Sequence, residues 1–382
     1  METKTKFPPL PEMKPLSWKL LNEGFDSIVF SYVGENKKFK KKVLRMFKQP
    51  IKQGFLKIPD GQREAKVALL EKFVKRFMHN NLQDIDIGTP YSITKEFVEQ
   101  MSETFEPLRL KWRRQESVIQ ENSRICQIHE NHCSHGTYTV EIKPKCGFLP
   151  TSPIVSESSY KKHVSRFQMM QVTKLYTGDV KEISKYNPLD LFSGNIDRIW
   201  KAINDLANIP QRNLILWENG KKATIKKLNK QKIVDILYKG PHLSQILRIQ
   251  KLDVLDIEGI ALIADKVGKL SWNDLISDDD VVNGVQNMLK GKFKIPTTKD
   301  ELIEFLNEAD IVTLKVLIAA FLISTAAKDC SIMISFEGPE LLNPKISIID
   351  IDMKSTRGIV KKYLSKDQLI VKRYEEYIAK LN

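Results

Sequence analysis

The stretch Glu141-Ile142-Lys143-Pro144-Lys145-Cys146-Gly147-Phe148-Leu149-Pro150 follows a short run, 137–140. Across the junction Tyr138, Val140 and Ile142 alternate with polar side chains. Such alternation is typical of a half-buried strand. Pro144 fixes its own φ and favours an extended conformation at Lys143, so Lys143 and Lys145 are expected to point the same way before the chain turns at Gly147. The stretch is either an anion clamp or a strand that ends in a solvated lysine turn. Local chemistry alone favours the lysine turn.

Length and charge limit the possibilities around this stretch. A chain of 382 residues, with 42% apolar and 28% charged residues, can bury a large core and is expected to form two domains or lobes. Its net charge of +14 indicates a polyanionic partner, which could be nucleic acid, an anionic membrane surface or a densely phosphorylated small molecule. Four cysteines are too few for a disulfide scaffold. No apolar segment follows the first residues, so we expect no secretory signal and reduced cysteines inside the cell.

The N-terminal part predicts a β-hairpin from strands at 28–33 and 42–47, with Gly24 in the loop before it and Arg45 on its second strand. Nucleotide kinases use this layout, because a loop covers the phosphates and a cation on the following strand reaches them. The loop has a single glycine, and a plain surface hairpin is the alternative. Helices are expected at 67–78 and 97–105.

A basic cluster follows at 109–114, with Trp112 among four cations. The tryptophan could stack on the bases of a single-stranded nucleic acid. The commoner alternative is a tryptophan packed in the core and surrounded by solvated arginines.

Cysteine and histidine then crowd together between residues 126 and 135. Four of these side chains could wrap one zinc ion: Cys126, His129, Cys133 and His135. Their spacing matches no zinc module, and the preferred interpretation is a polar loop without metal.

The C-terminal part predicts mainly helices. They are expected at 160–176 and 196–206, and over most of 230–306. The most apolar stretch, 311–327, is too short for a comfortable membrane span and carries Lys315, so we expect a buried central helix.

An acidic hairpin is predicted after that helix, from strands at 331–336 and 346–352. A hairpin centred near residue 341 would bring Asp350 and Asp352 opposite the start of the first strand, beside Asp329, with Asp350 and Asp352 on one face. Three carboxylates that converge require a cation, and Mg²⁺ with nucleotide phosphates would satisfy them. A solvent-exposed acidic strand end is the alternative. A basic stretch containing Lys354 and Arg357 follows, as phosphoryl transfer to an anionic acceptor would need.

Several long blocks in order, between residues 22 and 363, resemble the inositol pentakisphosphate 2-kinase family. They are the opening stretch 141–150, and then 165–175, 187–194, 251–259, 327–334 and 349–354. The resemblance implies an α+β, two-lobed fold distantly similar to protein kinases. Residues 1–143 would form a β-rich N-lobe with the phosphate loop and hinge, and residues 144–382 a larger, mostly helical C-lobe.

The resemblance also implies roles for individual residues. Asp329 would activate the acceptor hydroxyl, and Asp350 together with Asp329 would hold Mg²⁺. ATP would contact Gly24, Arg45, Glu141 and Asp350. The inositol phosphate would be bound by Lys143, Lys145, Lys174, Arg113, Arg212, Asn213, Lys354 and Arg357.

The implied function is ATP-dependent phosphorylation of the 2-hydroxyl of inositol 1,3,4,5,6-pentakisphosphate to give inositol hexakisphosphate (phytate). The alternatives are an inositol polyphosphate kinase of broader acceptor range and a non-enzymatic basic nucleic-acid-binding protein. ATP and Mg²⁺ are the expected cofactors. Plant members carry a Cys/His zinc site in the C-lobe, but residues 240–310 contain no cysteine, so we expect no zinc. A monomer in the nucleus or cytoplasm is expected, without a membrane span and without a specific nucleic-acid partner.

Overall fold

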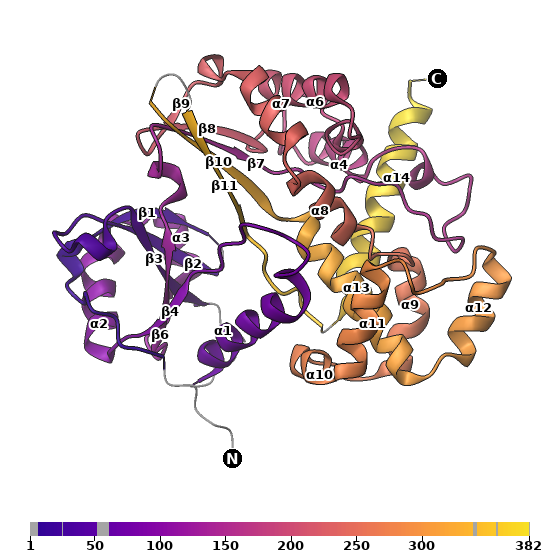
Figure 1. Ribbon diagram of the computed structural model, residues 1–382, viewed down its shortest axis with the longest axis horizontal. Coiled ribbons are helices and arrows are strands. Elements are labelled where there is room, and N and C mark those ends of the chain that lie inside the picture. Colours follow the sequence, from indigo (N-terminus) through magenta and orange to yellow (C-terminus); the bar gives the residue numbers. More distant parts are fainter. Residues whose placement is uncertain (1–6, 25, 52–60, 339–341, 357, 382) are drawn as a thin grey trace. The chain divides into compact units, whose positions relative to one another are not determined.

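The computed structural model describes residues 7–24, 26–51, 61–338, 342–356 and 358–381. The chain forms two units (Figure 1). Unit 1 comprises Met1–Glu71 and Asp86–Gly136, and unit 2 comprises Lys72–Ile85 and Thr137–Asn382. The boundary that the resemblance implies, between residues 143 and 144, stays a prediction.

Unit 1 is built on one antiparallel sheet. Its strands are β1 (Trp18–Glu23), β2 (Ser27–Tyr32), β3 (Lys42–Pro50), β4 (Thr89–Ser92), β5 (Ser117–Ile119) and β6 (Ile125–Glu130). Their order is β1-β2-β3-β6-β4, and β5 pairs with the far end of β3. The predicted hairpin is confirmed, because β2 and β3 pair from Ser27 with Phe47 to Ser31 with Val43.

Helices complete unit 1. They are α1 (Gln62–Phe73), whose last two residues belong to unit 2, α2 (Lys95–Phe105) and α3 (Lys111–Glu116). Thr94 caps α2 by accepting a hydrogen bond from the Phe97 N–H, and the apolar face of α2 packs on the sheet. The predicted helices at 67–78 and 97–105 are therefore present, although α1 begins earlier and residues 74–78 form a π-helical turn.

Unit 2 contains a second antiparallel sheet in the order β11-β10-β7-β8-β9. Its strands are β7 (Tyr138–Ile142), β8 (Leu214–Glu218), β9 (Lys221–Ala223), β10 (Ser331–Glu337) and β11 (Leu342–Ile349). The predicted strand before Lys143 is thus β7, which pairs on both sides, with β8 and β10. Antiparallel sheets with separate groups of helices make this an α+β protein, as expected.

The helices of unit 2 follow the sequence prediction in outline. They are α4 (Arg166–Tyr176), α5 (Pro188–Leu191), α6 (Ile196–Asn208), α7 (Lys230–Lys239), α8 (His242–Gln250), α9 (Asp256–Val267), α10 (Trp272–Ser277), α11 (Asp279–Leu289), α12 (Lys299–Glu308), α13 (Ile311–Lys328) and α14 (Ser365–Ala379). The helix expected from residue 160 begins only at Arg166. Ser165 and Gln168 form a capping box there, and this fixes the helix start.

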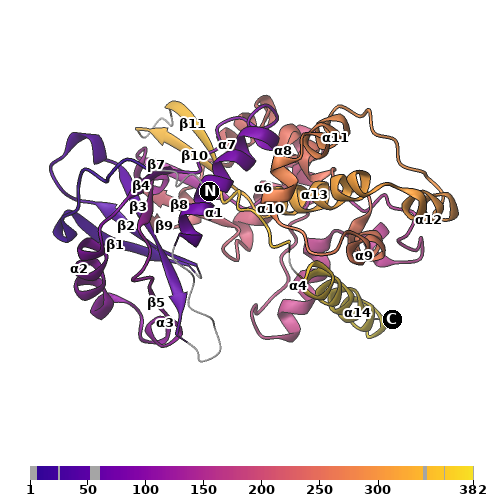
Figure 2. The ribbon, with the colours of Figure 1, turned by 90° about the horizontal axis from the view of Figure 1, so that it is seen from below.

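Helix α13 is the centre of the helical part of unit 2. It packs against α8, α9 and α11, and Figures 1 and 2 both show it among these helices. Among the described residues it is the one helix long and apolar enough to span a membrane, but 67% of it is buried. Lys315, near its N-terminal end, has its Nζ 3.4 Å from a carboxylate oxygen of Asp278. The expected buried central helix is confirmed.

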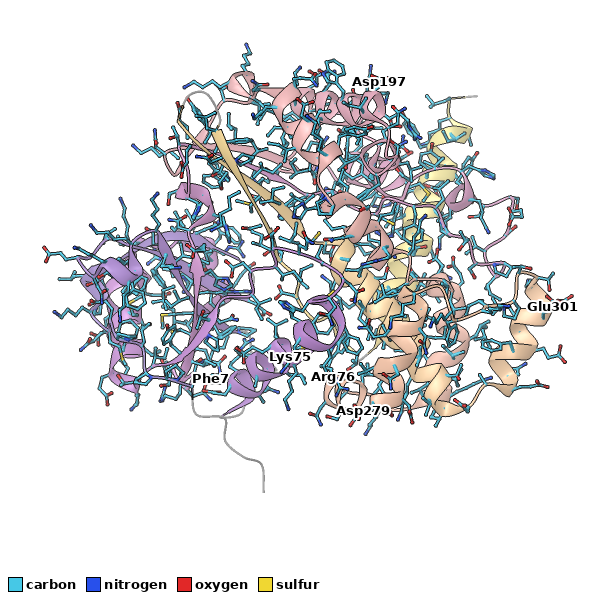
Figure 3. The ribbon with its side chains drawn as sticks, in the orientation of Figure 1. Phe7, Lys75, Arg76, Asp197, Asp279 and Glu301 are labelled. Carbon is cyan, nitrogen blue, oxygen red and sulfur yellow. The ribbon has the colours of Figure 1, made fainter. Side chains whose placement is uncertain are left out.

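The segment Lys72–Ile85 belongs to unit 2 through specific contacts. Figure 3 labels Arg76 and Asp279, which form an ion pair, and Arg76 also donates to the Ile276 carbonyl at 2.8 Å. His242 lies 2.9 Å from Asp84. These contacts join the segment to helices α8, α10 and α11.

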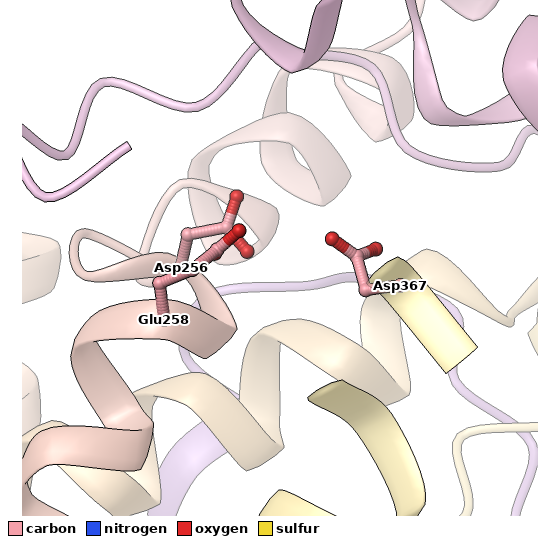
Figure 4. Close-up of side chains that lie close together, drawn as sticks. All are labelled: Asp256, Glu258 and Asp367. Atoms are coloured by element: carbon pink, nitrogen blue, oxygen red, sulfur yellow. The ribbon is translucent and has the colours of Figure 1, made fainter. Parts of the chain in front are cut away.

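A buried lysine joins three carboxylates elsewhere in unit 2. Figure 4 shows Asp256, Glu258 and Asp367 with their carboxylates facing one another. The Nζ of Lys161 lies 2.7–3.0 Å from an oxygen of each of them. Burial alone would lower the pKa of Lys161, but the charges of the three acids outweigh it and raise the pKa. An ammonium group therefore takes the place that a metal ion would have among these acids.

Replacement of Lys161 by methionine should destabilise unit 2 by about 3–5 kcal/mol, because it leaves buried carboxylates without their cation. The free energy of unfolding from urea denaturation measures this loss. Lys372→Met is the matched control, since Lys372 makes an exposed 3.9 Å pair with Glu376 that should contribute less than about 1 kcal/mol. Equal losses in the two variants would contradict a structural role for the Lys161 cluster.

Candidate functional site

Gly24 and Arg45, the two predicted nucleotide residues of unit 1, lie at the same end of its sheet. Gly24 is in the turn between β1 and β2, and its N–H donates to the Ser27 carbonyl at 2.9 Å. The Arg45 Nε donates to the Ser27 hydroxyl at 3.1 Å. The strand cation thus reaches the base of the loop that precedes β2, as a phosphate-binding arrangement requires. Phe25 lies outside the described residues.

The basic cluster at 109–114 differs from the interpretation with a core-packed tryptophan, and stacking on nucleic acid stays a prediction. Trp112 is 49% exposed, so it is not packed in the core, and the Arg113 guanidinium lies 4.0 Å from its ring centre. Arg109 is fully buried and pairs with Glu23 and Glu106, both at 2.6 Å. One of the four cations is therefore structural, and the stacked pair of Trp112 and Arg113 faces solvent.

The four predicted zinc ligands are not gathered around one point in the part of the chain that the structure describes. The only group of three acidic, cysteine or histidine side chains there with ligand atoms within 4.8 Å of one another is Asp256, Glu258 and Asp367. Cys126 is buried in the core of unit 1, and burial raises the pKa of its thiol. His129 lies three residues further along β6 and pairs with Asp86.

The opening stretch lies at the end of β7, and its lysines are arranged differently from the prediction. Lys145 has a φ of +65°, so the backbone is not extended there and the two-residue alternation ends. Burial lowers the pKa of Lys145, the nearby Lys143 and Lys174 lower it further, and Asp329 opposes them. Two lysines and one aspartate therefore lie within electrostatic reach of Lys145. Glu141 precedes them on β7, 3.7 Å from the Lys143 Nζ, and burial raises its pKa.

Asp329 follows the last residue of α13 and is separated from β10 by Cys330. Its carboxylate is 58% exposed and lies 2.5 Å from the Lys354 Nζ. The backbone at Lys354 is held by Trp272, whose indole N–H donates to the Lys354 carbonyl at 2.6 Å. Asp329 also raises the pKa of Tyr363, after the larger effect of burial. The Asp329 carboxylate is thus exposed to solvent and lies near two cations, Lys354 and Lys145.

The predicted acidic hairpin is present, because β10 and β11 pair as antiparallel strands, but the predicted register was wrong. Ser331 pairs with Ile349, two residues short of the register expected for a turn centred at residue 341. Strand β11 ends at Ile349, because Asp350 has a φ of +63°. Asp350 and Asp352 are therefore not on one face of a strand, and Asp329, Asp350 and Asp352 do not form a three-carboxylate group within the described residues.

Two of these carboxylates still adjoin the start of β10. An Oδ of Asp350 lies 3.4 Å from the Ser331 hydroxyl, and Asp329 and Asp350 both raise the pKa of Cys330, after the larger effect of burial. Two exposed carboxylates at one hairpin end fit Mg²⁺, which takes oxygen ligands and is commonly held by one or two carboxylates together with substrate phosphates.

The remaining predicted substrate residues lie in several segments. Lys174 is in the last turn of α4. The Asn213 carbonyl accepts a hydrogen bond from the Lys143 N–H at 2.9 Å, and this bond joins the 210–213 turn to the opening stretch. Arg212, in the same turn, is exposed. Arg113 is in unit 1, and Arg357 lies outside the described residues.

Sequence reasoning missed the buried residues that support this site. Gln250 contacts the backbone of the opening stretch, and the Tyr186 hydroxyl donates to the Pro144 carbonyl at 2.7 Å. The sequence did contain a signal for the burial of Gln250. This polar residue occupies a position on the apolar face of its helix, in line with Leu243 and Ile246. No comparable pattern marks Tyr186.

Comparison with known proteins identifies the family of this chain. A profile of the family described as inositol-pentakisphosphate 2-kinase matches residues 21–369. The inositol-pentakisphosphate 2-kinase of Arabidopsis thaliana is 28% identical, over 91% of this chain and 87% of its own length. A Cryptococcus neoformans protein of the same name is 24% identical over 96% of this chain and 95% of its own. One from Danio rerio is 48% identical over 81 residues, which are 21% of this chain and 17% of its own.

Matches over nearly the whole chain make this protein a kinase. More particularly, the chain belongs to the inositol-pentakisphosphate 2-kinase family.

Proposed function

We propose that the protein transfers the γ-phosphoryl group of ATP to the 2-hydroxyl of inositol 1,3,4,5,6-pentakisphosphate, which gives inositol hexakisphosphate and ADP. The observation that carries this proposal is the group of lysines around Asp329. Its carboxylate is 2.5 Å from Lys354, and its charge acts on Lys145, which lies among Lys143 and Lys174. An acceptor with five phosphates needs several cations, and a hydroxyl that attacks phosphorus needs a base beside it.

In the proposed reaction, Asp329 accepts the proton of the 2-hydroxyl while the hydroxyl oxygen forms a bond to the γ-phosphorus. The bond between that phosphorus and the β–γ bridging oxygen breaks, and ADP leaves with the electron pair. Lys145 and Lys354 would hold phosphates of the acceptor near the Asp329 carboxylate. Most of the rate enhancement in such transfers comes from position and charge, which these side chains supply.

Magnesium would be held by Asp350 with Asp329, and it would neutralise the nucleotide phosphates. In unit 2, Glu141 would serve the adenine side, next to Lys143. In unit 1, Arg45 would contact nucleotide phosphates, with the backbone at Gly24 beside them. The 3.1 Å contact of Arg45 with Ser27 supports this role, because it holds the guanidinium at the loop.

The acceptor would also contact Lys174, Arg212, Asn213, Arg113 and Arg357. The net charge of +14 fits a polyanionic substrate of this kind. In the same proposal, residues 1–143 form the nucleotide lobe of a kinase-like fold and residues 144–382 the acceptor lobe. The protein would act as a monomer in the nucleus or cytoplasm.

The test is a transfer assay with γ-labelled ATP and Mg²⁺ on two acceptors. One is the 1,3,4,5,6-pentakisphosphate, whose free hydroxyl is at position 2. The other is a pentakisphosphate that already carries the 2-phosphate and has a free equatorial hydroxyl. The expected result is label in hexakisphosphate from the first acceptor alone.

Two other results of the transfer assay would contradict different parts of the proposal. Comparable transfer to both acceptors would mean a kinase of broader acceptor range and would contradict the specificity for position 2. Absence of transfer to the 1,3,4,5,6-pentakisphosphate, with ATP bound and the protein folded, would contradict the proposed function itself.

A further inference from the structure

The side chain of Gln250, the last residue of α8, makes three hydrogen bonds to two segments of the site. Its oxygen accepts from the Gly147 N–H at 2.8 Å. Its amide nitrogen donates to the Lys145 carbonyl at 2.8 Å and to the Ala327 carbonyl at 3.3 Å. The residue is fully buried, and both amide protons have partners.

The backbone of Gln250 makes a further contact with α13. Its carbonyl accepts a hydrogen bond from the Ser324 hydroxyl, which is also buried. Gln250 is thus joined to the last turn of α13, where Asp329 follows Ala327 by two residues, and to the turn that carries Lys145. One side chain therefore links the two segments that would supply the base and the acceptor-binding cation.

The backbone conformation of Lys145 needs support from hydrogen bonds such as those of Gln250. A φ of +65° is unfavourable for a residue with a Cβ, so the surrounding structure has to hold it. Gln250 does so at two points, the carbonyl of Lys145 itself and the N–H two residues further on. The lysine side chain is then held where its charge interacts with that of Asp329.

We propose that Gln250 is a positioning residue that fixes Lys145 relative to Asp329 and so determines the rate of phosphoryl transfer. The inference rests on the proposed function. Gln250 does not touch the substrate, and it acts through the backbone of the 145–147 turn and the end of α13. Its loss therefore lowers kcat through misplacement of Lys145 and Asp329, with little effect on the binding of ATP.

The test compares Gln250→Met, which conserves volume but removes the hydrogen bonds, with a matched control. Gln286→Met is that control, because the Gln286 amide also donates to a backbone carbonyl, that of Arg76 at 2.9 Å, in unit 2. We expect kcat to fall by up to about 100-fold in Gln250→Met, as a misplacement of roughly 1 Å can produce, with the KM for ATP unchanged. In Gln286→Met, kcat should stay near that of the wild type.

Hydrogen exchange gives a readout that needs no turnover. The amides of residues 145–149 should exchange faster in Gln250→Met than in the wild type and should be unchanged in Gln286→Met. Unchanged exchange, or faster exchange with an unchanged kcat, would overturn the proposal. If the wild type transferred no phosphate, the proposed function would fail, and the exchange comparison would still decide whether Gln250 holds the turn.

Ser324→Ala is a milder second variant in case Gln250→Met does not fold. It removes only the hydroxyl that donates to the Gln250 carbonyl, so kcat and the exchange of residues 145–149 should change in the same direction as in Gln250→Met, but less. A folded Ser324→Ala protein with wild-type exchange and wild-type kcat would overturn the proposal.

Discussion

Replacement of Asp329 by asparagine should lower kcat for pentakisphosphate phosphorylation by roughly 10²- to 10⁴-fold, because the amide cannot accept the proton of the attacking hydroxyl. The side chain keeps its size at the end of α13. Its exposed carboxylate contacts Lys354 and contributes little to the core, so the fold should persist. The measurement is steady-state transfer from labelled ATP, combined with calorimetric titration of pentakisphosphate. Binding should be largely retained while turnover is lost.

Asp265→Asn is a suitable control for the Asp329 experiment. Asp265 is an exposed aspartate on α9 that has no proposed role, and its replacement should leave kcat unchanged. Near-normal turnover in Asp329→Asn would show that another group accepts the proton. Lost binding together with lost turnover would instead assign Asp329 to acceptor recognition.

Replacement of Lys145 by methionine should lower kcat/KM for the pentakisphosphate by roughly 100-fold. An ionic hydrogen bond to a phosphate contributes about 1.5–3 kcal/mol, and the charge of Lys145 interacts with that of Asp329, the proposed base. The KM for ATP should change much less, because the residue belongs to the acceptor side of the proposed site. Titration of each substrate at saturating levels of the other separates the two effects.

Lys239→Met provides the control for this charge change. Lys239 is exposed at the end of α7 and has no proposed contact, so its loss tests the effect of net charge alone. Equal losses for ATP and pentakisphosphate in Lys145→Met would argue against a place for Lys145 in the acceptor site.

Local patterns were sufficient to predict much of the fold. The β2–β3 hairpin, the strand before Lys143, helix α13 and the β10–β11 hairpin each follow from alternation or from continuous apolar character. These signals depend on residues close in sequence, which is why they survive without knowledge of the tertiary structure. The resemblance added the family, which the profile match over residues 21–369 confirms.

Backbone conformation at two site residues was not predictable in this way. Lys145 and Asp350 both adopt positive φ, although neither is glycine. The extended geometry assumed for Lys143 to Lys145, and the common face assumed for Asp350 and Asp352, were therefore wrong. At Lys145 a residue distant in the sequence contacts the turn, since the Gln250 amide donates to the Lys145 carbonyl. At Asp350 the carboxylate lies 3.4 Å from the Ser331 hydroxyl, at the end of the hairpin.

The supporting contacts were also beyond sequence reasoning because they join distant segments. The Gln250 contacts with the opening stretch span more than 100 residues, and the cluster around Lys161 joins three separate parts of unit 2. Nothing in the local sequence around Lys161 distinguishes it from the neighbouring Lys162, which pairs with Glu157 instead. Its partners are known only once α9 and α14 are folded against it.

A crystal structure of the protein with the 1,3,4,5,6-pentakisphosphate and a non-hydrolysable ATP analogue would test the central proposal most directly. The account predicts that an Asp329 oxygen lies within hydrogen-bond reach of the 2-hydroxyl, roughly 2.6–3.2 Å, with Lys145 and Lys174 on acceptor phosphates. A pentakisphosphate bound away from these lysines, or one whose 2-hydroxyl points away from Asp329, would contradict it.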